Sequence, residues 1–362
     1  MNNVSSYDLN NLRQLDSIRG LMAVAILGCH FLAAFSYRLP TLGVFQPFKV
    51  LFNAQTGLCY FFVLSGFVIT YSLLTQKNIS FWKFLIKRFL RLLPPVFLSI
   101  IVLYSYIILF GQPEIGTLYS DSQWLQDTLF LKGASINPFY DIFVNTYIVG
   151  DVFYNGNLWA IRYEFLVPLL ILFILSFFTN KKIALSSILF VLGLIISLGG
   201  AEKRVFYIGC MLFGSFLCVV LDSIDYHKYK SWVLVVLIST FVFSNIFIPT
   251  DSILVMRLLN FFLVLTVIIY IVNDNGTNKV RLLNLRILRF LGRISYEIYC
   301  YHLFFIIIVG CPLYESLKLY VNHNLAVVFA YFTVLGLTIL ASFFSNKYAT
   351  PINNSLIKMV LK

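Results

Sequence analysis

Residues 17–37 read SIRGLMAVAILGCHFLAAFSY, and this stretch decides the class of fold. A helix needs about 20 predominantly apolar residues to cross the hydrocarbon core of a bilayer, and this stretch is long enough. Its basic side chains are Arg19, near the start, and His30, in the second half. The stretch therefore predicts a membrane-spanning helix that carries two basic groups.

Apolar runs of similar length recur along the whole chain. Of its 362 residues 60% are hydrophobic and only 12% are charged, whereas a soluble domain usually carries about a quarter charged residues. We therefore predict an all-α, polytopic integral membrane protein with about ten transmembrane helices. The predicted spans are 17–37, 54–75, 93–111, 157–178, 183–200, 203–221, 231–249, 253–272, 290–310 and 324–346.

The net charge of +12 does not indicate a nucleic-acid partner, because the basic residues recur at the ends of apolar segments instead of forming one patch. With the N-terminus in the cytoplasm, the inner connections are basic and the outer connections collect most acidic residues. This pattern follows the positive-inside tendency and places both termini in the cytoplasm. The longest outer connection, about 112–156, either covers a site that opens outward or is a passive lid.

The six cysteines lie almost wholly inside apolar runs and show no metal-ligand spacing. We interpret them as packing residues, and we expect neither a disulfide nor a metal site.

Ionisable residues inside spans are costly and therefore deserve a functional interpretation. Arg19 and His30 are eleven residues apart, which is roughly three helical turns, so they share one face and lie roughly 16 Å apart along the axis. A guanidinium at the inner rim suits phosphate, and a neutral imidazole in a dry cavity can take a proton from a hydroxyl. The alternative for His30 is an ordinary buried histidine.

A second basic motif, KRFLRLLPP, lies at the inner side of the third predicted span. Arg88 and Arg91 are three residues apart and are neighbours if the segment is helical. Pro94 and Pro95 follow at the expected start of the span, where proline is tolerated. We favour phosphate binding by Arg88 and Arg91 over a plain positive-inside anchor.

The segment NGNLWAIRYEF places Arg162 and Glu164 inside the fourth predicted span. Glu164 could orient His30 or bind an acceptor hydroxyl; the alternative is a structural ion pair with Arg162. The ninth span, in GRISYEIYCYHLFF, brings Ser295, Tyr296 and His302 within about two turns.

In the second span, FFVLSGFVI contains Ser65 and Gly66, which we assign mainly to close helix packing.

Together these motifs resemble the acyltransferase-3 family of membrane O-acyltransferases, in an order that covers nearly the whole chain. The resemblance implies a single transmembrane domain over residues 1–362, without the SGNH hydrolase-like domain of some members, in a bacterial cytoplasmic (inner) membrane. It implies transfer of an acyl group, usually acetyl, from cytoplasmic acyl-CoA to a hydroxyl of a surface polysaccharide, lipopolysaccharide or lipid-linked precursor. The family's arginine–histidine motif falls on Arg19 and His30, its R-x-x-R motif on Arg88 and Arg91, and its glutamate on Glu164.

The expected partners are therefore acetyl-CoA as donor, a glycan or lipid-linked sugar as acceptor, and the lipid bilayer, without metal. In the expected reaction His30, oriented by Glu164, deprotonates the acceptor hydroxyl, while Arg19, Arg88 and Arg91 hold the CoA phosphates. Ser295, Tyr296, His302 and Arg162 are candidates for binding the acceptor or the oxyanion. A covalent acetyl-histidine relay fits the same residues. A transporter or flippase is the alternative function, since intramembrane His, Arg and Glu also line substrate pathways.

Overall fold

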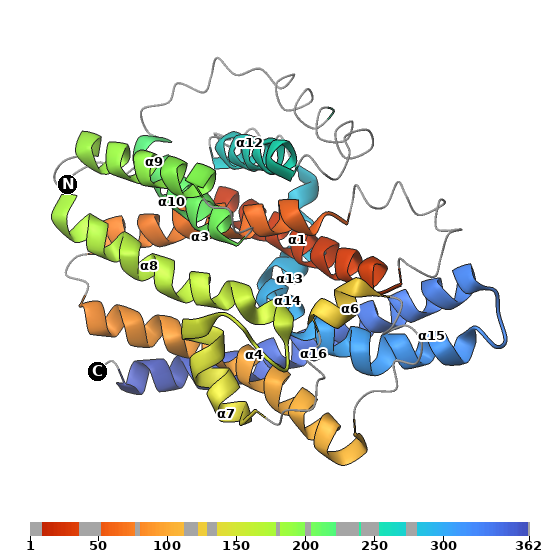
Figure 1. Ribbon diagram of the computed structural model, residues 1–362. Helices are drawn as coiled ribbons and strands as arrows, with labels where there is room; N and C mark the ends of the chain where they lie inside the picture. The colour runs from red at the N-terminus through yellow and green to blue at the C-terminus, as the bar shows by residue number, and fades with distance from the viewer. Residues whose placement is uncertain are drawn as a thin grey trace. The chain divides into compact units, whose positions relative to one another are not determined.

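A computed structural model describes residues 9–35, 52–76, 80–111, 122–128, 136–178, 182–199, 204–221, 239, 253–272 and 281–360. Within these segments the chain forms helices and no strands, as predicted (Figure 1). The helices, in chain order, are α1 (Leu9–Phe35), α3 (Ala54–Thr75), α4 (Phe81–Phe110), α6 (Gln123–Thr128), α7 (Pro138–Tyr140), η2 (Asp141–Val149), η3 (Gly156–Leu158), α8 (Trp159–Phe178), α9 (Lys182–Gly199), α10 (Val205–Val220), α12 (Ile253–Val272), η6 (Arg281–Asn284), α13 (Arg286–Arg293), α14 (Ser295–Phe305), η7 (Ile306–Gly310), α15 (Cys311–Leu317) and α16 (His323–Val360).

Among the described residues, six helical stretches are long and apolar enough to cross a membrane: Leu12–Phe35, Ala54–Thr75, Phe81–Phe110, Gly156–Phe178, Ser295–Leu317 and His323–Val360. They correspond to six of the predicted spans. Three further predictions correspond to shorter apolar helices, Ile183–Ser197, Val205–Val220 and Arg257–Val272. The predicted span over 231–249 lies almost entirely outside the described residues. The chain is thus a multi-pass helical membrane protein.

The prediction was wrong about where α4 begins. The helix starts at Phe81 and continues through Pro94 and Pro95, so these prolines lie inside the helix and not at its start. A proline inside a helix removes a backbone hydrogen bond but is tolerated in membrane helices, where neighbours satisfy the freed carbonyl. As a result, Arg88 and Arg91 lie on the membrane helix itself, one turn apart.

The predicted span 290–310 is also corrected. Helix α13 ends at Arg293, and α14 begins at Ser295 after Ile294 leaves helical geometry, with φ −99° and ψ 9°. The apolar stretch that follows is longer than predicted and reaches Leu317. It contains a π-helical segment, η7, directly after α14, and such segments are frequent at functional sites.

The described structure divides into two compact units, each assembled from three separate stretches of chain. Unit 1 contains Met1–Met22, Gln55–Phe84 and Leu166–Arg293; unit 2 contains Ala23–Ala54, Leu85–Phe165 and Ile294–Lys362. The expectation of a single domain over the whole chain stays a prediction.

Unit 1 is built around close contact between α3 and α10. A Cβ built on Gly66 would collide with the Met211 carbonyl oxygen, and Ser215 Oγ donates a hydrogen bond to the Gly66 carbonyl over 3.3 Å. Gly66 therefore lets the two backbones touch, which confirms its predicted packing role. Figure 1 shows α9 and α10 running side by side in the same unit.

Unit 2 is built around α14, which packs against α16. Glu297 of α14 accepts a hydrogen bond from Asn346 of α16 at 3.0 Å, and the hydroxyls of Tyr301 and Ser345 lie 2.7 Å apart. These polar contacts sit among buried apolar side chains and fix the rotation of α14 about its axis.

Many large apolar side chains lie on the outside of the helices, which is expected where lipid replaces water. On α8 the exposed fractions of Phe173 and Phe177 are 61% and 65%, and on α16 that of Phe332 is 64%. The cysteines, by contrast, are free thiols that are buried, with Cys29 partly exposed, as predicted for packing residues.

Candidate active site

Two histidines from opposite ends of the sequence meet in unit 2. His30 Nδ1 of α1 lies 2.8 Å from His302 Nε2 of α14, and the two rings are nearly parallel, with an interplanar angle of 20°. Asn157 Nδ2, from η3, lies 3.0 Å from His302 Nε2 and 3.3 Å from His30 Nδ1. His302 is fully buried and His30 is partly exposed. These three side chains form the central polar cluster of the unit.

The contacts of the cluster decide where its protons lie. His302 Nδ1 is 3.1 Å from the Ile298 carbonyl oxygen, which can only accept, so Nδ1 of His302 carries the proton. In the neutral ring, Nε2 of His302 is then an acceptor. His30 Nδ1 donates to it, and the Asn157 amide nitrogen supplies a second N–H on the same side. The remaining nitrogen of His30, Nε2, carries the lone pair and is the atom that can accept a proton.

The loop before α8 holds Asn157 in place. Asn155 Nδ2 donates to the Cys300 carbonyl at 2.9 Å and lies 3.2 Å from Ser99 Oγ, while the Tyr299 hydroxyl donates to the Asn157 carbonyl. Upstream, the buried carboxylate of Asp141 accepts hydrogen bonds from Asn145 Nδ2 at 2.8 Å and from the backbone N–H groups of Phe153 at 2.8 Å and Tyr154 at 3.0 Å. These hydrogen bonds hold the loop in place and keep the amide of Asn157 at the histidines.

An aromatic ring covers His30. Trp124 of α6 stacks on the imidazole with a centroid separation of 5.1 Å. Ser122 positions this short helix: its hydroxyl accepts from the Leu125 N–H at 3.3 Å and donates to the Ala33 carbonyl of α1 at 3.1 Å. Part of the predicted outer connection is therefore helical and lies directly on the candidate base.

Glu164 does not pair with Arg162 and is not a hydrogen-bond partner of His30 within the described residues. It forms an ion pair with Arg88, whose NH2 lies 2.8 Å from Glu164 Oε2, and Arg88 Nε also donates to the Glu164 carbonyl at 2.6 Å. Arg162 instead donates to the Val149 carbonyl at 2.7 Å. Because the Arg88 side chain is only 10% exposed, its charge needs a nearby carboxylate more than the charge of Arg162 does.

The other predicted site residues of unit 2 are not hydrogen-bond partners of His30 or His302 within the described residues. Arg91 is exposed one turn beyond Arg88 on α4. The Tyr296 hydroxyl donates to the Leu92 carbonyl of α4 at 2.8 Å, and Ser295 is buried at the first turn of α14. His302 is thus the residue of the late motif that the structure joins to His30.

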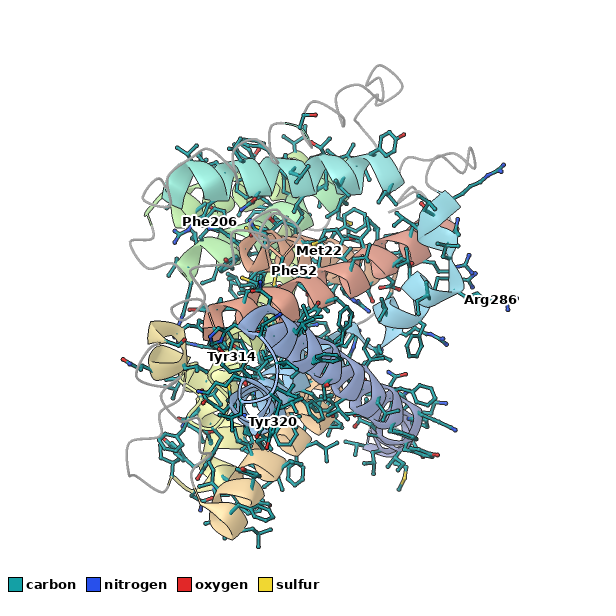
Figure 2. The ribbon with its side chains drawn as sticks, turned by 90° about the vertical axis from the view of Figure 1, so that its right-hand side faces the viewer. Met22, Phe52, Phe206, Arg286, Tyr314 and Tyr320 are labelled. Atoms are coloured by element: carbon teal, nitrogen blue, oxygen red, sulfur yellow. The ribbon has the colours of Figure 1, made fainter. Side chains whose placement is uncertain are left out.

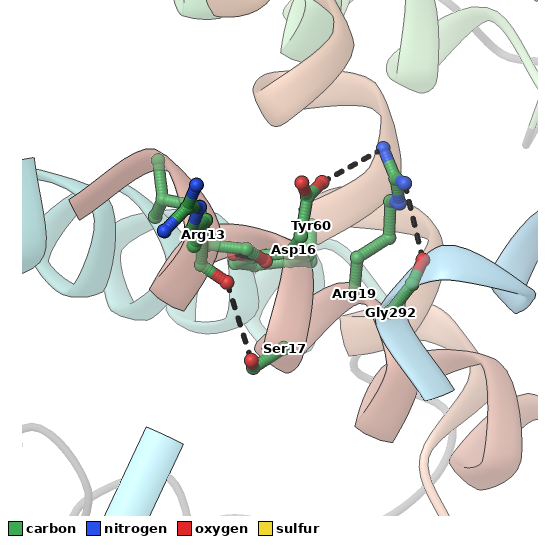
Figure 3. A network of polar contacts seen from close by, with 7 residues as sticks. Arg13, Asp16, Ser17, Arg19, Tyr60 and Gly292 are labelled. Carbon is green, nitrogen blue, oxygen red and sulfur yellow. Dashed lines mark hydrogen bonds and ion pairs between the residues drawn. The ribbon is translucent and has the colours of Figure 1, made fainter. Parts of the chain in front are cut away.

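Arg19 belongs to unit 1, on the N-terminal part of α1 (Figure 3). Its guanidinium lies 3.2 Å from Asp16 Oδ1 and donates to the Gly292 carbonyl at 3.1 Å. The backbones approach closely here, because a Cβ on Gly20 would clash with Gly292 and Leu291. The side chain is 27% exposed, so part of it is accessible where α1 meets α13.

Asn157 and Trp124 are the residues of the cluster that the sequence analysis missed. Asn157 lies in a segment already noted, NGNLW, and a signal for it existed, since an amide at the start of an apolar span is costly unless it is paired. Trp124 carries no comparable signal, because an aromatic residue in an outer connection is common at a membrane interface.

Comparison with known proteins identifies the family. Residues 12–346 match the family model of acyltransferase-3, described as an acyltransferase domain. The chain is also similar to the peptidoglycan O-acetyltransferase OatA of Listeria monocytogenes, with 27% identity over 206 residues, which is 52% of this chain and 29% of that protein. The chain therefore spans well under half the length of that relative. No solved structure matches.

The family match extends over nearly the whole chain and includes the helices that carry His30, Asn157 and His302. On this basis the chain belongs to the acyltransferase-3 family of membrane acyltransferases.

Proposed function

We propose that the chain is an O-acetyltransferase of the bacterial inner membrane. It moves an acetyl group from cytoplasmic acetyl-CoA to a hydroxyl of a cell-surface glycan or of its lipid-linked precursor. The observation that carries the proposal is the His30–His302–Asn157 cluster, since it leaves a basic nitrogen on a partly exposed imidazole in a chain of an acyltransferase family. The similarity to the Listeria protein, a peptidoglycan O-acetyltransferase, supports both the acetyl group and a glycan acceptor.

In the proposed reaction His30 Nε2 takes the proton of the acceptor hydroxyl, and the hydroxyl oxygen attacks the carbonyl carbon of the thioester. The tetrahedral adduct collapses, the carbon–sulfur bond breaks, and the CoA thiolate leaves. The leaving sulfur recovers the proton from His30, so that the products are the O-acetyl ester and CoA thiol. Positioned general bases contribute about 10² to 10⁴ in rate, which sets the effect expected from losing His30.

The orientation of His30 supports this assignment. When Nε2 takes up a proton, the ring becomes an imidazolium whose Nδ1–H still points at the lone pair of His302 Nε2. The acceptor nitrogen of His302 therefore stabilises the charge that develops during proton transfer. In this scheme His302, and not Glu164, is the group that orients the base.

The three arginines that the sequence suggests for binding acetyl-CoA have two different roles in the proposal. Arg91 is exposed on α4 and suits a phosphate of CoA. Arg88 is committed to Glu164 and contributes as half of an ion pair that fixes α4 against the start of α8. Arg19 keeps its proposed contact with a CoA phosphate, since its side chain is partly exposed.

The first test is release of CoA thiol from acetyl-CoA by the purified full-length protein in detergent. We expect thiol release, as slow hydrolysis without an acceptor and faster transfer with a glycan acceptor, to fall at least about 100-fold in His30→Ala. The matched control is His323→Ala, which removes an exposed histidine at the start of α16. His323 Nδ1 lies 3.3 Å from the Tyr314 hydroxyl, and His323 is not part of the cluster at His30. Arg91→Ala should raise the KM for acetyl-CoA about tenfold with a smaller effect on kcat.

Binding of CoA is measured in the same samples, so that loss of catalysis can be distinguished from loss of CoA binding. Full activity in His30→Ala would remove His30 as the base. Absence of both thiol release and CoA binding in the wild-type protein would remove the acyltransferase proposal and favour the transporter alternative, which moves substrate without consuming acetyl-CoA.

A further inference from the structure

Arg257 of α12 is a buried cation that the proposed reaction does not use. It is only 8% exposed, and its guanidinium carbon lies 5.7 Å from the ring centroid of Phe206, on α10. Within the described segments Arg257 has neither an ion pair nor a hydrogen bond. A guanidinium is always charged, and burying a charge without a compensating partner is unfavourable. Because the described residues supply no carboxylate for this charge, the guanidinium is suited to an added anion.

Three helices of unit 1 begin around this position. Cys59 lies beside Cys210 at 3.8 Å, and a Cβ on Gly214 would clash with the Val63 carbonyl, so α3 and α10 run parallel. Phe206 and Phe213 of α10 contact Arg257 and Phe261 of α12, respectively, so α12 runs in the same direction. The N-terminal ends of α3, α10 and α12 therefore lie at one end of the unit, where their dipoles add positive potential.

The N-terminus of α10 lies next to the guanidinium. Phe206, the ring beneath Arg257, is in the first turn of α10, and the N-cap residue Arg204 supplies no side-chain cap. The first N–H groups of a helix bind anions readily. In α10 the Tyr207 N–H already donates to the Arg204 carbonyl at 3.2 Å, so the N–H groups of Val205 and Phe206 are the candidates. A 16-residue helix such as α10 is long enough for this effect.

Hydrogen bonds between α3 and α12 add further donors at the same end. Thr56 Oγ1 donates to Asn260 Oδ1 at 3.0 Å, and Asn260 Nδ2 donates to Gln55 Oε1 at 3.2 Å. Because its oxygen is used as an acceptor, Gln55 presents its amide N–H groups, which can only donate. Asn260 lies one turn from Arg257 on the same face of α12.

From these contacts we infer that Arg257 and the first turn of α10 form an anion site for the phosphate of a membrane-soluble ligand, with Gln55 as a further donor. The charge pattern of the connections predicts that α3, α10 and α12 all begin on the outer side of the membrane. Two sources present phosphate there: a phospholipid headgroup, and the phosphate of a lipid-linked glycan. The second source rests on the proposed function, since that molecule is the acceptor; phosphate binding itself does not.

The test is equilibrium binding of farnesyl diphosphate, a short isoprenoid diphosphate, to the full-length protein in detergent without acetyl-CoA. We expect Arg257→Gln to weaken binding about tenfold or more, and Arg257→Lys to weaken it less, because lysine keeps the charge but loses the planar pair of donors. Gln55→Ala should weaken binding about threefold, as expected for loss of one neutral hydrogen bond.

The control is Arg286→Gln, which makes the same change of charge at an exposed residue of α13. Figure 2 shows Arg286 and Phe206 on opposite sides of the view. The affinity of Arg286→Gln for farnesyl diphosphate should stay within about twofold of wild type, since no contact to the anion site is lost. If Arg257→Gln does not fold, Arg257→Lys and Gln55→Ala still test the site.

Competition distinguishes the sources. Displacement of the probe by phosphatidylglycerol in phosphatidylcholine vesicles, but not by phosphatidylcholine alone, would identify a site for anionic phospholipid. Resistance to phosphatidylglycerol would identify a site selective for isoprenoid phosphates. No binding by the wild-type protein, or equal affinity in Arg257→Gln and wild type, would overturn the inference. Because acetyl-CoA is absent, these results are independent of thiol release by His30.

Discussion

A histidine that takes a proton from a hydroxyl must present a lone pair, and His302 decides which nitrogen of His30 does so. The Ile298 carbonyl fixes the proton of His302 on Nδ1, so His302 Nε2 accepts from His30 Nδ1 and leaves His30 Nε2 free to act as the base. Asn157 donates to the same acceptor and holds both rings in register. His302 is therefore a positioning residue in the proposed mechanism.

Replacing His302 with Leu should lower kcat about 100-fold or more, because the acceptor for His30 Nδ1–H is lost and the imidazole can rotate or change tautomer. The KM for acetyl-CoA should change less than about threefold, since no donor contact is removed. His302→Gln, which can present an amide oxygen as acceptor, should recover part of kcat. These constants are measured by thiol release.

The midpoint of thermal unfolding serves as the control for the His302 variants. A purely structural role would lower stability in both variants and reduce kcat in proportion to the folded fraction. Equal kcat in His302→Leu and His302→Gln would contradict the positioning role.

At the scale of helices, glycine sets the spacing between α3 and α10. Without a hydrophobic driving force in lipid, membrane helices associate through close packing, and small residues let backbones approach. A Cβ on Gly66 would strike the Met211 carbonyl, and one on Gly214 would approach the Val63 carbonyl just as closely. Backbone carbonyls cannot move aside as a flexible side chain can, so both contacts depend on the absence of a side chain.

Gly66→Ala and Gly214→Ala should each lower the free energy of unfolding by about 1–3 kcal/mol, the usual cost of overpacking. The matched control is Gly336→Ala on α16, where an added Cβ meets nothing within 4 Å. In this control alanine should leave stability unchanged or raise it by about 0.5–1 kcal/mol through helix propensity. The stability of all three variants is measured by thermal unfolding, which is followed by size-exclusion chromatography. A stable Gly66→Ala protein would show that the interface adjusts more easily than its geometry indicates.

At the scale of the whole molecule, the distribution of charge determines how the chain sits in the bilayer. The basic residues of the connections fall mainly on the side of the N-terminus, and the last helix, α16, ends in a lysine-containing segment. Since basic connections stay in the cytoplasm, both termini should lie there.

A fluorescent protein fused after Lys362 should fluoresce in bacterial cells, because such a protein folds in the cytoplasm but not after export in the unfolded state. Alkaline phosphatase fused at the same position should be inactive, since it needs the oxidising outer compartment. Fusions after Gly111, in the outer connection, should give the opposite pair of results. An active phosphatase at Lys362 would place the C-terminus on the outer side, through either an odd number of spans or an inverted orientation of the whole chain.

The sequence by itself determined the membrane class and predicted the apolar helices that the described residues form. The roles of its candidate site residues stay predictions. Apolar length and charge at the ends of a span are local properties, so they can be read without knowing what packs against what. The helical spacing of Arg88 and Arg91, and the small residue Gly66 at a helix interface, could be predicted for the same reason. The family resemblance named His30 as a candidate base, and this role stays a prediction.

Only the tertiary structure decided the partners. His30 and His302 are 272 residues apart in sequence, and Arg88 and Glu164 are 76 residues apart. Sequence reasoning paired Glu164 with its neighbour Arg162 or with His30, because it could compare only depth and spacing along a helix. Which charges meet depends on the rotation of each helix and on the loop that carries Asn157. Those are fixed by packing between distant segments, since a buried charge or amide takes whichever partner the packed helices bring within hydrogen-bond distance.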